Sequence, residues 1–199
     1  MVYLFFIETY MRENLPERII LDINASAPLI EATDIFDREI NLKDYRGKKV
    51  LVAFFRHAGC PFCNSRVHAL EKKYKEWSDR GLEMIFFFES TKEILQSSRF
   101  HTSVSPIPLI ADPNKVWYTK YGVENSVAKS IKGHLTGFFA AAFDAAKNKL
   151  PLHMMAGDES INTIPAEFLV NEQGIARKVH YARGLRDRIS MQAIEEFIG

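Results

Sequence analysis

The chain has 199 residues, of which 47% are hydrophobic and 26% charged, a composition typical of one soluble globular domain. Its formal net charge of +1 excludes the strongly basic balance expected of a nucleic-acid-binding protein, and equally a long acidic tail. The two cysteines, Cys60 and Cys63, lie too close in sequence to form a disulfide framework between distant parts of a fold.

Residues 1–23 are predicted to form an arm outside the main domain. The apolar residues 2–7 have no basic flank and no small-residue cleavage site, and they are too few to cross a bilayer. Met11 is an alternative start, which would make residues 1–10 an extension. No membrane partner is expected, and the default compartment is the cytoplasm.

The next segments predict a hairpin, a strand and a helix in that order. Polar and apolar residues alternate over 28–42, which is typical of a short hairpin. The continuous apolar run 50–55 predicts a central strand that is covered on both faces. The period then changes to that of a helix, which begins at Pro61 and is expected to end at Gly81. The two cysteines therefore lie where a buried strand passes into a helix.

The remaining segments continue the alternation of strands and helices. They predict a strand at 82–88, a helix opened by the capping-box pattern of 90–93, a strand at 108–111, a helix through 116–121, a hairpin at 167–181 and a closing helix at 191–198 capped by Ser190. This order predicts an α/β sandwich.

Residues 125–162 stand outside that plan. Apolar side chains recur at helical spacing up to residue 149 and are followed by a loop, so an inserted helix is expected. Packing of this helix on the domain is the favoured interpretation, and a homodimer or partner surface is the alternative.

A Cys-x-x-Cys pair at the start of a helix is typical of a redox-active dithiol. Unpaired N–H groups and the positive end of the helix dipole favour the thiolate of Cys60, and the thiolate is the nucleophile. Cys63 lies one turn further on, near enough to attack a mixed disulfide and close the pair. Arg56 and His57 are candidates for lowering the thiol pKa further.

Zinc binding and an inert core pair are the alternatives for the cysteines. A single Cys-x-x-Cys, with His57 and His68 at spacings unlike those of zinc fingers, disfavours a metal site. An inert pair has no reason to flank Pro61 at a strand-to-helix junction. No glycine-rich loop next to a strand indicates a nucleotide site, and neither a metal nor an organic cofactor is expected.

Four segments together carry a family pattern by their order and spacing: Ala27-Pro28-Leu29, Ile40 to Val50, Phe54 to Cys63, and Pro108 to Val123. From about residue 24 onward they resemble the AhpC/TSA redoxins, and in particular peroxiredoxin-like members with a thioredoxin-style dithiol. The resemblance implies a thioredoxin-like three-layer sandwich over 24–199, with an N-terminal hairpin extension and the helical segment 125–162 inserted. It also implies an antioxidant-type thiol oxidoreductase that acts on a disulfide or a peroxide and is restored by an external thiol system such as thioredoxin or glutathione.

Two positions depart from the typical peroxiredoxin pattern. Cys63 aligns with the family's peroxidatic cysteine, so Cys60 stands where the family has a threonine, while Pro61 is retained. Proline replaces the family's peroxide-binding arginine within residues 163–167. These losses disfavour fast peroxide chemistry, because positioned donors accelerate that step. The candidate substitutes for the lost arginine are Arg56, Arg66 and Arg99.

Ile164 and Pro165, directly before a predicted strand, resemble the cis-proline loop of thioredoxins, whose backbone pairs with a bound peptide. We therefore predict a cis peptide bond before Pro165 and a role for both residues, with Pro61, in positioning the substrate. The alternative is an ordinary trans proline at the start of a strand.

Two mechanisms and one further interpretation follow. In the favoured mechanism Cys60 attacks a substrate disulfide and Cys63 resolves the mixed species. In the second, a peroxide oxidises Cys63 to a sulfenic acid that condenses with Cys60. From another functional class, the chain would be a redox sensor or binding module switched by the Cys60–Cys63 disulfide.

Overall fold

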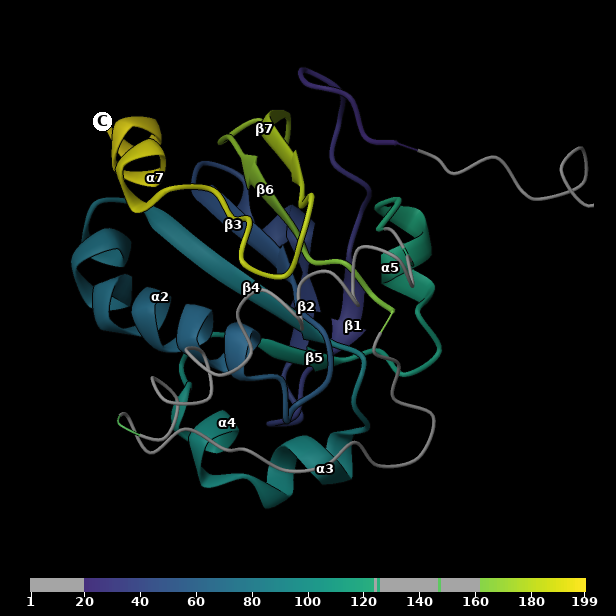
Figure 1. Cartoon of the computed structure of the whole chain (residues 1–199). Helices are drawn as coiled ribbons and strands as arrows, with labels where there is room; N and C mark the ends of the chain where they lie inside the picture. The colour runs from purple at the N-terminus through teal and green to yellow at the C-terminus, as the bar shows by residue number, and fades with distance from the viewer. Residues whose placement is uncertain (1–19, 124, 126–146, 148–161) are drawn as a thin grey trace, which may run out of the picture.

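The computed structural model describes residues 20–123, 125, 147 and 162–199. At its centre is a five-stranded mixed sheet with the strand order β5-β4-β3-β6-β7 (Figure 1). Its strands are β3 (Lys49–Phe54), β4 (Leu82–Phe88), β5 (Leu109–Ala111), β6 (Ala166–Val170) and β7 (Ala176–Tyr181). β3, β4 and β5 run parallel, whereas β6 is antiparallel to β3, and β7 to β6. The predicted strands and the late hairpin are confirmed.

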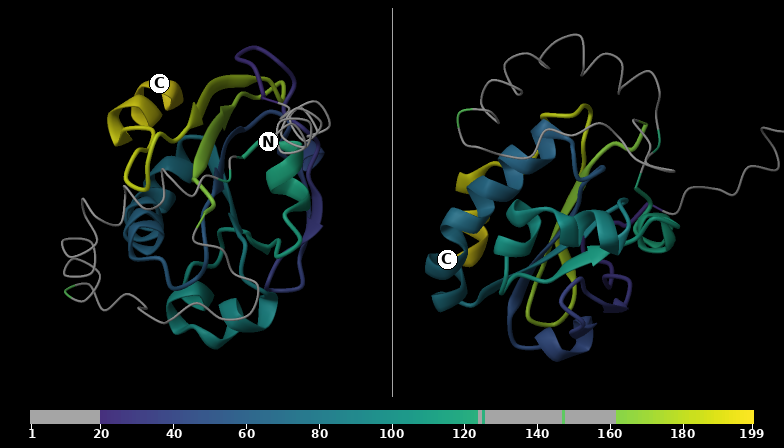
Figure 2. Two further views of the ribbon diagram at one scale, coloured as in Figure 1. Left: turned by 45° about the vertical axis from the view of Figure 1, so that its right-hand side comes forward. Right: turned by 90° about the horizontal axis from the view of Figure 1, so that it is seen from below.

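Helices and a hairpin cover the two faces of this sheet and make three layers (Figure 2). One face packs against α2 (Pro61–Asp79) and α7 (Met191–Ile198), and the other packs against α5 (Val116–Lys120). The hairpin of β1 (Glu31–Thr33) and β2 (Glu39–Asn41), followed by the short helix η1 (Leu42–Tyr45), lies on the α5 side. The thioredoxin-like sandwich with its N-terminal hairpin extension is thus confirmed.

The central strand β3 is buried on both faces. Leu51 and Ala53 belong to the apolar cluster under α2, whereas Val52 and Phe54 belong to the cluster under α5. Phe54 stacks on Phe87 of the neighbouring strand, with 4.6 Å between ring centroids. Alternate side chains of a strand point to opposite faces, so a strand covered twice requires the continuous apolar run seen in the sequence.

Helix α2 begins at Pro61, whose fixed φ suits the first helical position and whose missing N–H would have had no intrahelical partner there. Three side chains on its inner face, Val67, Leu70 and Trp77, are fully buried. Gly81 follows the helix with φ +87°, a left-handed conformation that glycine adopts without strain. The predicted start and end of this helix are confirmed.

The capping pattern of residues 90–93 opens a helix one position later than expected. α3 (Lys92–Ser97), which is followed by α4 (Arg99–Ser103), has Thr91 as its N-cap, and the Thr91 side chain accepts a hydrogen bond from the backbone N–H of Ile94 at 3.4 Å. Ser90 instead contacts the segment that carries the cysteines. The closing helix α7 is capped by Ser190 as predicted, since Ser190 Oγ accepts from the N–H of Ala193 at 3.1 Å.

Most of the predicted arm 1–23 and most of the predicted helical insertion 125–162 lie outside the described residues, and both stay predictions. Among the helices in the described part of the chain, none combines the length and the apolar character needed to cross a membrane.

Candidate active site

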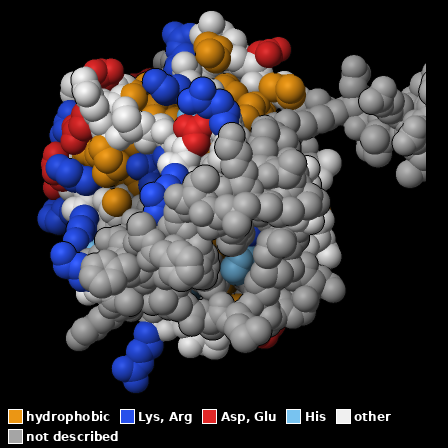
Figure 3. Space-filling model, viewed as in Figure 1, with side chains coloured by type: hydrophobic (Ala, Val, Ile, Leu, Met, Phe, Trp, Pro, Cys, Tyr) orange, Lys and Arg blue, Asp and Glu red, His pale blue; other side chains and the backbone are white. Residues whose placement is uncertain are grey.

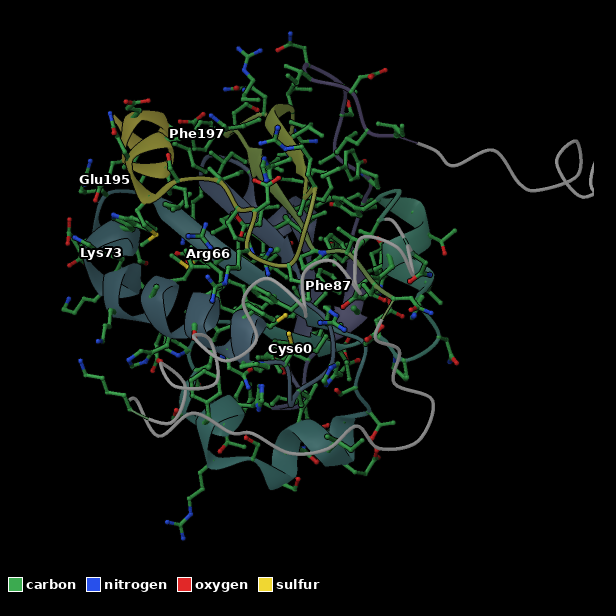
Figure 4. The ribbon with its side chains drawn as sticks, in the orientation of Figure 1. Cys60, Arg66, Lys73, Phe87, Glu195 and Phe197 are labelled. Carbon is green, nitrogen blue, oxygen red and sulfur yellow. The ribbon has the colours of Figure 1, made fainter. Side chains whose placement is uncertain are left out.

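The two cysteines lie at the point where the chain leaves β3 and enters α2. Cys60 is the N-cap residue of α2, and Cys63 belongs to its first turn. Both are free cysteines, and both are fully buried. Figure 4 shows Cys60 at the start of α2, near the middle of the molecule, with Arg66 further along the same helix. The topology therefore places the two cysteines just beyond the C-terminal end of the central strand β3.

Buried hydrogen bonds hold the segment before the cysteines, residues 55–60, which we name the cysteine loop. The N–H of Ala58 donates to Ser90 Oγ at 2.7 Å, and the carbonyl of Ala58 accepts from Asn64 Nδ2 at 2.7 Å. The N–H of Cys60 donates to the carbonyl of His57 at 3.0 Å. Because a buried backbone group is costly without a partner, these bonds fix the loop in one conformation. The sequence pattern did not place Asn64 or Ser90 at the site.

Behind the cysteine loop lies a buried carboxylate, Glu89, at the end of β4. Its Oε2 accepts from Thr163 Oγ1 at 2.6 Å and lies 3.0 Å from Lys115 Nζ. The N–H of Glu89 also donates to the carbonyl of Arg56 at 3.3 Å. This cluster holds the segment before β6 against the cysteine loop.

The charge of Arg56 acts directly on Cys60. Its guanidinium is buried, and Nη1 donates to Cys60 Sγ at 3.7 Å. Burial by itself raises the pKa of the Cys60 thiol, but the hydrogen bond from Cys63 and the positive charges of Arg56 and Arg188 outweigh it, and the pKa falls from 9.0 to about 6. At neutral pH Cys60 is therefore a thiolate.

The pKa of Cys63 is shifted in the opposite direction to that of Cys60. Burial raises its pKa well above the usual value, and the hydrogen bond it donates to Cys60 and the negative charge on that sulfur raise it further. The backbone N–H of Arg56 donates to Cys63 Sγ at 3.4 Å. The pair therefore holds one proton at neutral pH, and that proton lies on Cys63.

The arginines considered as substitutes for the family arginine have different positions. Arg66 forms a two-pronged ion pair with the fully buried Glu167, in which Nε and Nη2 each lie 2.8 Å from a carboxylate oxygen. Arg99 is exposed at the start of α4. Besides Arg56, the arginine whose charge lowers the pKa of both thiols is Arg188, in the loop between β7 and α7. No spacing in the sequence links Arg188 to the cysteines, so Arg188 was not predicted from the sequence as a site residue.

The prediction of a cis peptide bond before Pro165 is wrong. Among the described residues the cis bond precedes Pro106, so the Ile164–Pro165 bond is trans. The carbonyl of Pro165 accepts from the N–H of Ala182 at 3.0 Å and thereby extends the β6–β7 pairing by one step. A proline next to the first residue of a strand is tolerated because no ladder hydrogen bond needs its missing N–H. Ile164 and Pro165 are buried, and Ile164 belongs to the same apolar cluster as both cysteines.

Within the described ranges, no three His, Cys, Asp or Glu side chains gather as a set of metal ligands.

Comparison with known proteins gives one matching family model and a small set of relatives. The model of the AhpC/TSA family matches residues 23–179. Peroxiredoxin TSA2 of Saccharomyces cerevisiae is 27% identical over 114 residues, which cover 53% of this chain and 58% of that protein. A Mycobacterium tuberculosis protein named as a peroxiredoxin is 25% identical over 59% of this chain and 76% of its own length. The thiol-disulfide oxidoreductase ResA of Bacillus cereus is 24% identical over 58% of this chain and 73% of its own length.

Solved structures share the fold at lower identity. A thiol:disulfide interchange protein DsbE from Chlorobium tepidum superposes with a TM-score of 0.59 at 16% identity, covering 90% of this chain and 99% of its own. The reduced 2-Cys peroxiredoxin of Plasmodium vivax gives 0.59 at 18% identity, covering 88% and 79%. With the dithiol at the start of α2 and the family match over most of its length, the chain belongs to the AhpC/TSA family and is a thiol-dependent oxidoreductase of the peroxiredoxin-like and thiol-disulfide oxidoreductase kind.

Proposed function

We propose that the dithiol reduces disulfides, with Cys60 as the attacking cysteine and Cys63 as the resolving one. The observation that carries this proposal is the opposite shift of the two thiol pKa values, which leaves a thiolate on Cys60 and a proton on Cys63. Since the thiolate is the reactive form, the sulfur at the N-cap of α2 attacks first.

Each turnover moves two electrons from the protein to the substrate. The Cys60 thiolate attacks one sulfur of the substrate disulfide, forms a mixed disulfide and releases the first thiolate. Burial still raises the pKa of Cys63, but Cys60 is then neutral, so its negative charge no longer adds to that shift and Cys63 loses its proton more readily. The Cys63 thiolate attacks Cys60, closes the intramolecular disulfide and releases the second half of the substrate as a thiol.

A peroxidase in which Cys63 is the peroxidatic residue is the second candidate. The observation that favours it is the backbone N–H of Arg56, which donates to Cys63 Sγ at 3.4 Å and would stabilise negative charge there. The raised pKa of Cys63 disfavours it, because a protonated sulfur is a poor nucleophile towards peroxide.

The proposal also assigns roles to the residues around the dithiol and to an external reductant. Pro61 lies between the two cysteines, and Ile164 shares their apolar cluster; these two residues and Pro165 are proposed to position the substrate. Arg56 is proposed to tune the thiols together with His57, which also lies in the cysteine loop. An external thiol system, such as thioredoxin or glutathione, restores the reduced pair. The cytoplasmic location and the homodimer stay predictions from the sequence.

Rapid-mixing oxidation of the reduced protein, by a model disulfide and by hydrogen peroxide, tests the assignment on wild type, Cys60→Ser and Cys63→Ser. Cys63→Ser is expected to keep the fast first step with the disulfide and to accumulate a mixed disulfide on Cys60, whereas Cys60→Ser loses that step by about a thousandfold or more. Fast sulfenic-acid formation by Cys60→Ser with peroxide would instead establish the peroxidase. Slow reaction with both oxidants, together with an assembly state that depends on reductant, would establish the sensor.

A further inference from the structure

Arg188 presents one edge of its guanidinium without a hydrogen bond. Its side chain is only 8% exposed, and Nη1 is anchored by donating to the carbonyl of Asp187 at 2.8 Å. Among the described residues, Nε and Nη2 are buried and have no hydrogen-bond partner. The nearby carboxylate, Glu167, reaches Nε with Oε1 at 3.6 Å, which is an ion pair and not a hydrogen bond.

Glu167 already accepts hydrogen bonds from the Nε and Nη2 atoms of another arginine, Arg66. Arg66 uses Nε and Nη2 to bind its two carboxylate oxygens at 2.8 Å each, and Oε2 also accepts from the N–H of Ile189 at 2.9 Å. One buried carboxylate therefore lies between two largely buried arginines, and the second of them, Arg188, is ion-paired with it but makes no hydrogen bond to a described residue through its fork of Nε and Nη2.

The chemistry of that fork selects its ligand. The Nε–Nη2 edge of a guanidinium matches the two oxygens of a carboxylate, and a buried fork whose donors have no partner gains two charge-assisted hydrogen bonds when one arrives. The loop that carries Arg188 packs on the dithiol, because Leu185 and Ile189 belong to the same buried apolar cluster as both cysteines. The charge of Arg188 also lowers the pKa of each thiol. Figure 3 shows further Lys and Arg side chains on the face that carries β7 and the loop to α7.

We propose that the oxidised substrate is a low-molecular-weight disulfide that bears a carboxylate, and that the Nε–Nη2 edge of Arg188 binds this carboxylate while Cys60 attacks the neighbouring sulfur. A small molecule is inferred because both sulfurs are fully buried and Arg188 is nearly so. The proposal rests on the proposed function and adds its substrate class. The exchange itself is unchanged: the Cys60 thiolate bonds to one sulfur, the other leaves as a carboxylate-bearing thiolate, and Cys63 closes the pair.

Single-turnover oxidation of the reduced protein by dithiodipropionate and by its neutral diamide tests the proposal near pH 8, where Cys60 is ionised. Arg188→Gln is expected to slow the reaction with dithiodipropionate about 10- to 100-fold, and that with the diamide by less than about threefold. Arg188→Lys keeps the charge without the fork and is expected to lose most of the preference. Arg177→Gln is the matched control, because Arg177 is exposed at the opposite end of β7 and its Nη1 donates to Asn24 Oδ1 at 2.6 Å.

Each outcome decides one question. If both Arg188 variants slow the two disulfides by the same factor, the carboxylate site is overturned while disulfide reduction stands. If Arg188→Gln does not fold, the test is made by comparing wild type with Arg188→Lys. A second comparison uses wild type alone, which should react more slowly with the cationic disulfide cystamine than with dithiodipropionate. If reduced wild type reduces none of these disulfides, the proposed function itself fails.

Discussion

Replacing Glu167 by alanine is expected to lower the free energy of unfolding by about 3–5 kcal/mol, because it leaves two largely buried arginines without their shared carboxylate. Glu167 is fully buried, pairs with Arg66 through two hydrogen bonds of 2.8 Å, and lies 3.6 Å from Arg188. It also accepts from the backbone of Ile189, so the loop before α7 loses an anchor in the same substitution. Urea unfolding of the reduced protein at neutral pH measures the loss.

Glu76→Ala is the matched control for that substitution. Glu76 pairs with Lys73 at 2.9 Å, but both side chains are about half exposed, so its removal is expected to cost less than about 1 kcal/mol. A similar small loss for Glu167→Ala would show that the buried arginines find other partners, and it would contradict the stabilising role of Glu167 between them.

The free energy of unfolding of the reduced protein is expected to rise by up to about 4 kcal/mol between pH 6 and 9 because of Cys60 alone. Its pKa is about 6 when folded and 9.0 ordinarily, so within this window the unfolded chain binds a proton that the folded chain does not. Each pH unit then adds about 1.4 kcal/mol. The contribution is complete above the unfolded pKa and is lost as the pH falls through the folded one.

The contribution of Cys63 to the pH dependence of stability has the opposite sign to that of Cys60. Its folded pKa is raised, so above the ordinary value of 9.0 the unfolded chain releases a proton that the folded chain keeps, and stability falls again. Urea unfolding at a series of pH values, with wild type and Cys60→Ser compared under reductant, measures the Cys60 contribution between pH 6 and 9, where burial, the largest cause of its raised pKa, keeps Cys63 protonated in both folded proteins. Parallel curves for the two proteins between pH 6 and 9 would contradict the lowered pKa.

The sequence was sufficient for features that depend on short spacing. The run 50–55 predicted a doubly covered strand, Pro61 and Gly81 marked the ends of α2, and the dithiol was correctly placed between strand and helix. In each case the deciding physics is local: apolar burial on both faces, the fixed φ of proline, the left-handed φ of glycine.

Features that depend on distant partners were not predictable in the same way. Arg66 binds Glu167 and Arg188 approaches it only because β6 and the loop before α7 return to the start of α2. The local Ile-Pro pattern did not reveal the trans bond before Pro165, nor the pairing of the Pro165 carbonyl with the N–H of Ala182. The pairing of these buried charges is set by the tertiary fold and not by any short sequence pattern.

Titration of the reduced protein, followed by the ultraviolet absorbance of thiolate, tests most directly the claim that Cys60 is the ionised nucleophile, and it requires no reagent to reach the buried sulfurs. The wild type is expected to show a first thiolate with a midpoint near pH 6 that is absent in Cys60→Ser. A first midpoint near pH 9, or a midpoint near 6 that persists in Cys60→Ser, would contradict the assignment of Cys60 as the attacking cysteine.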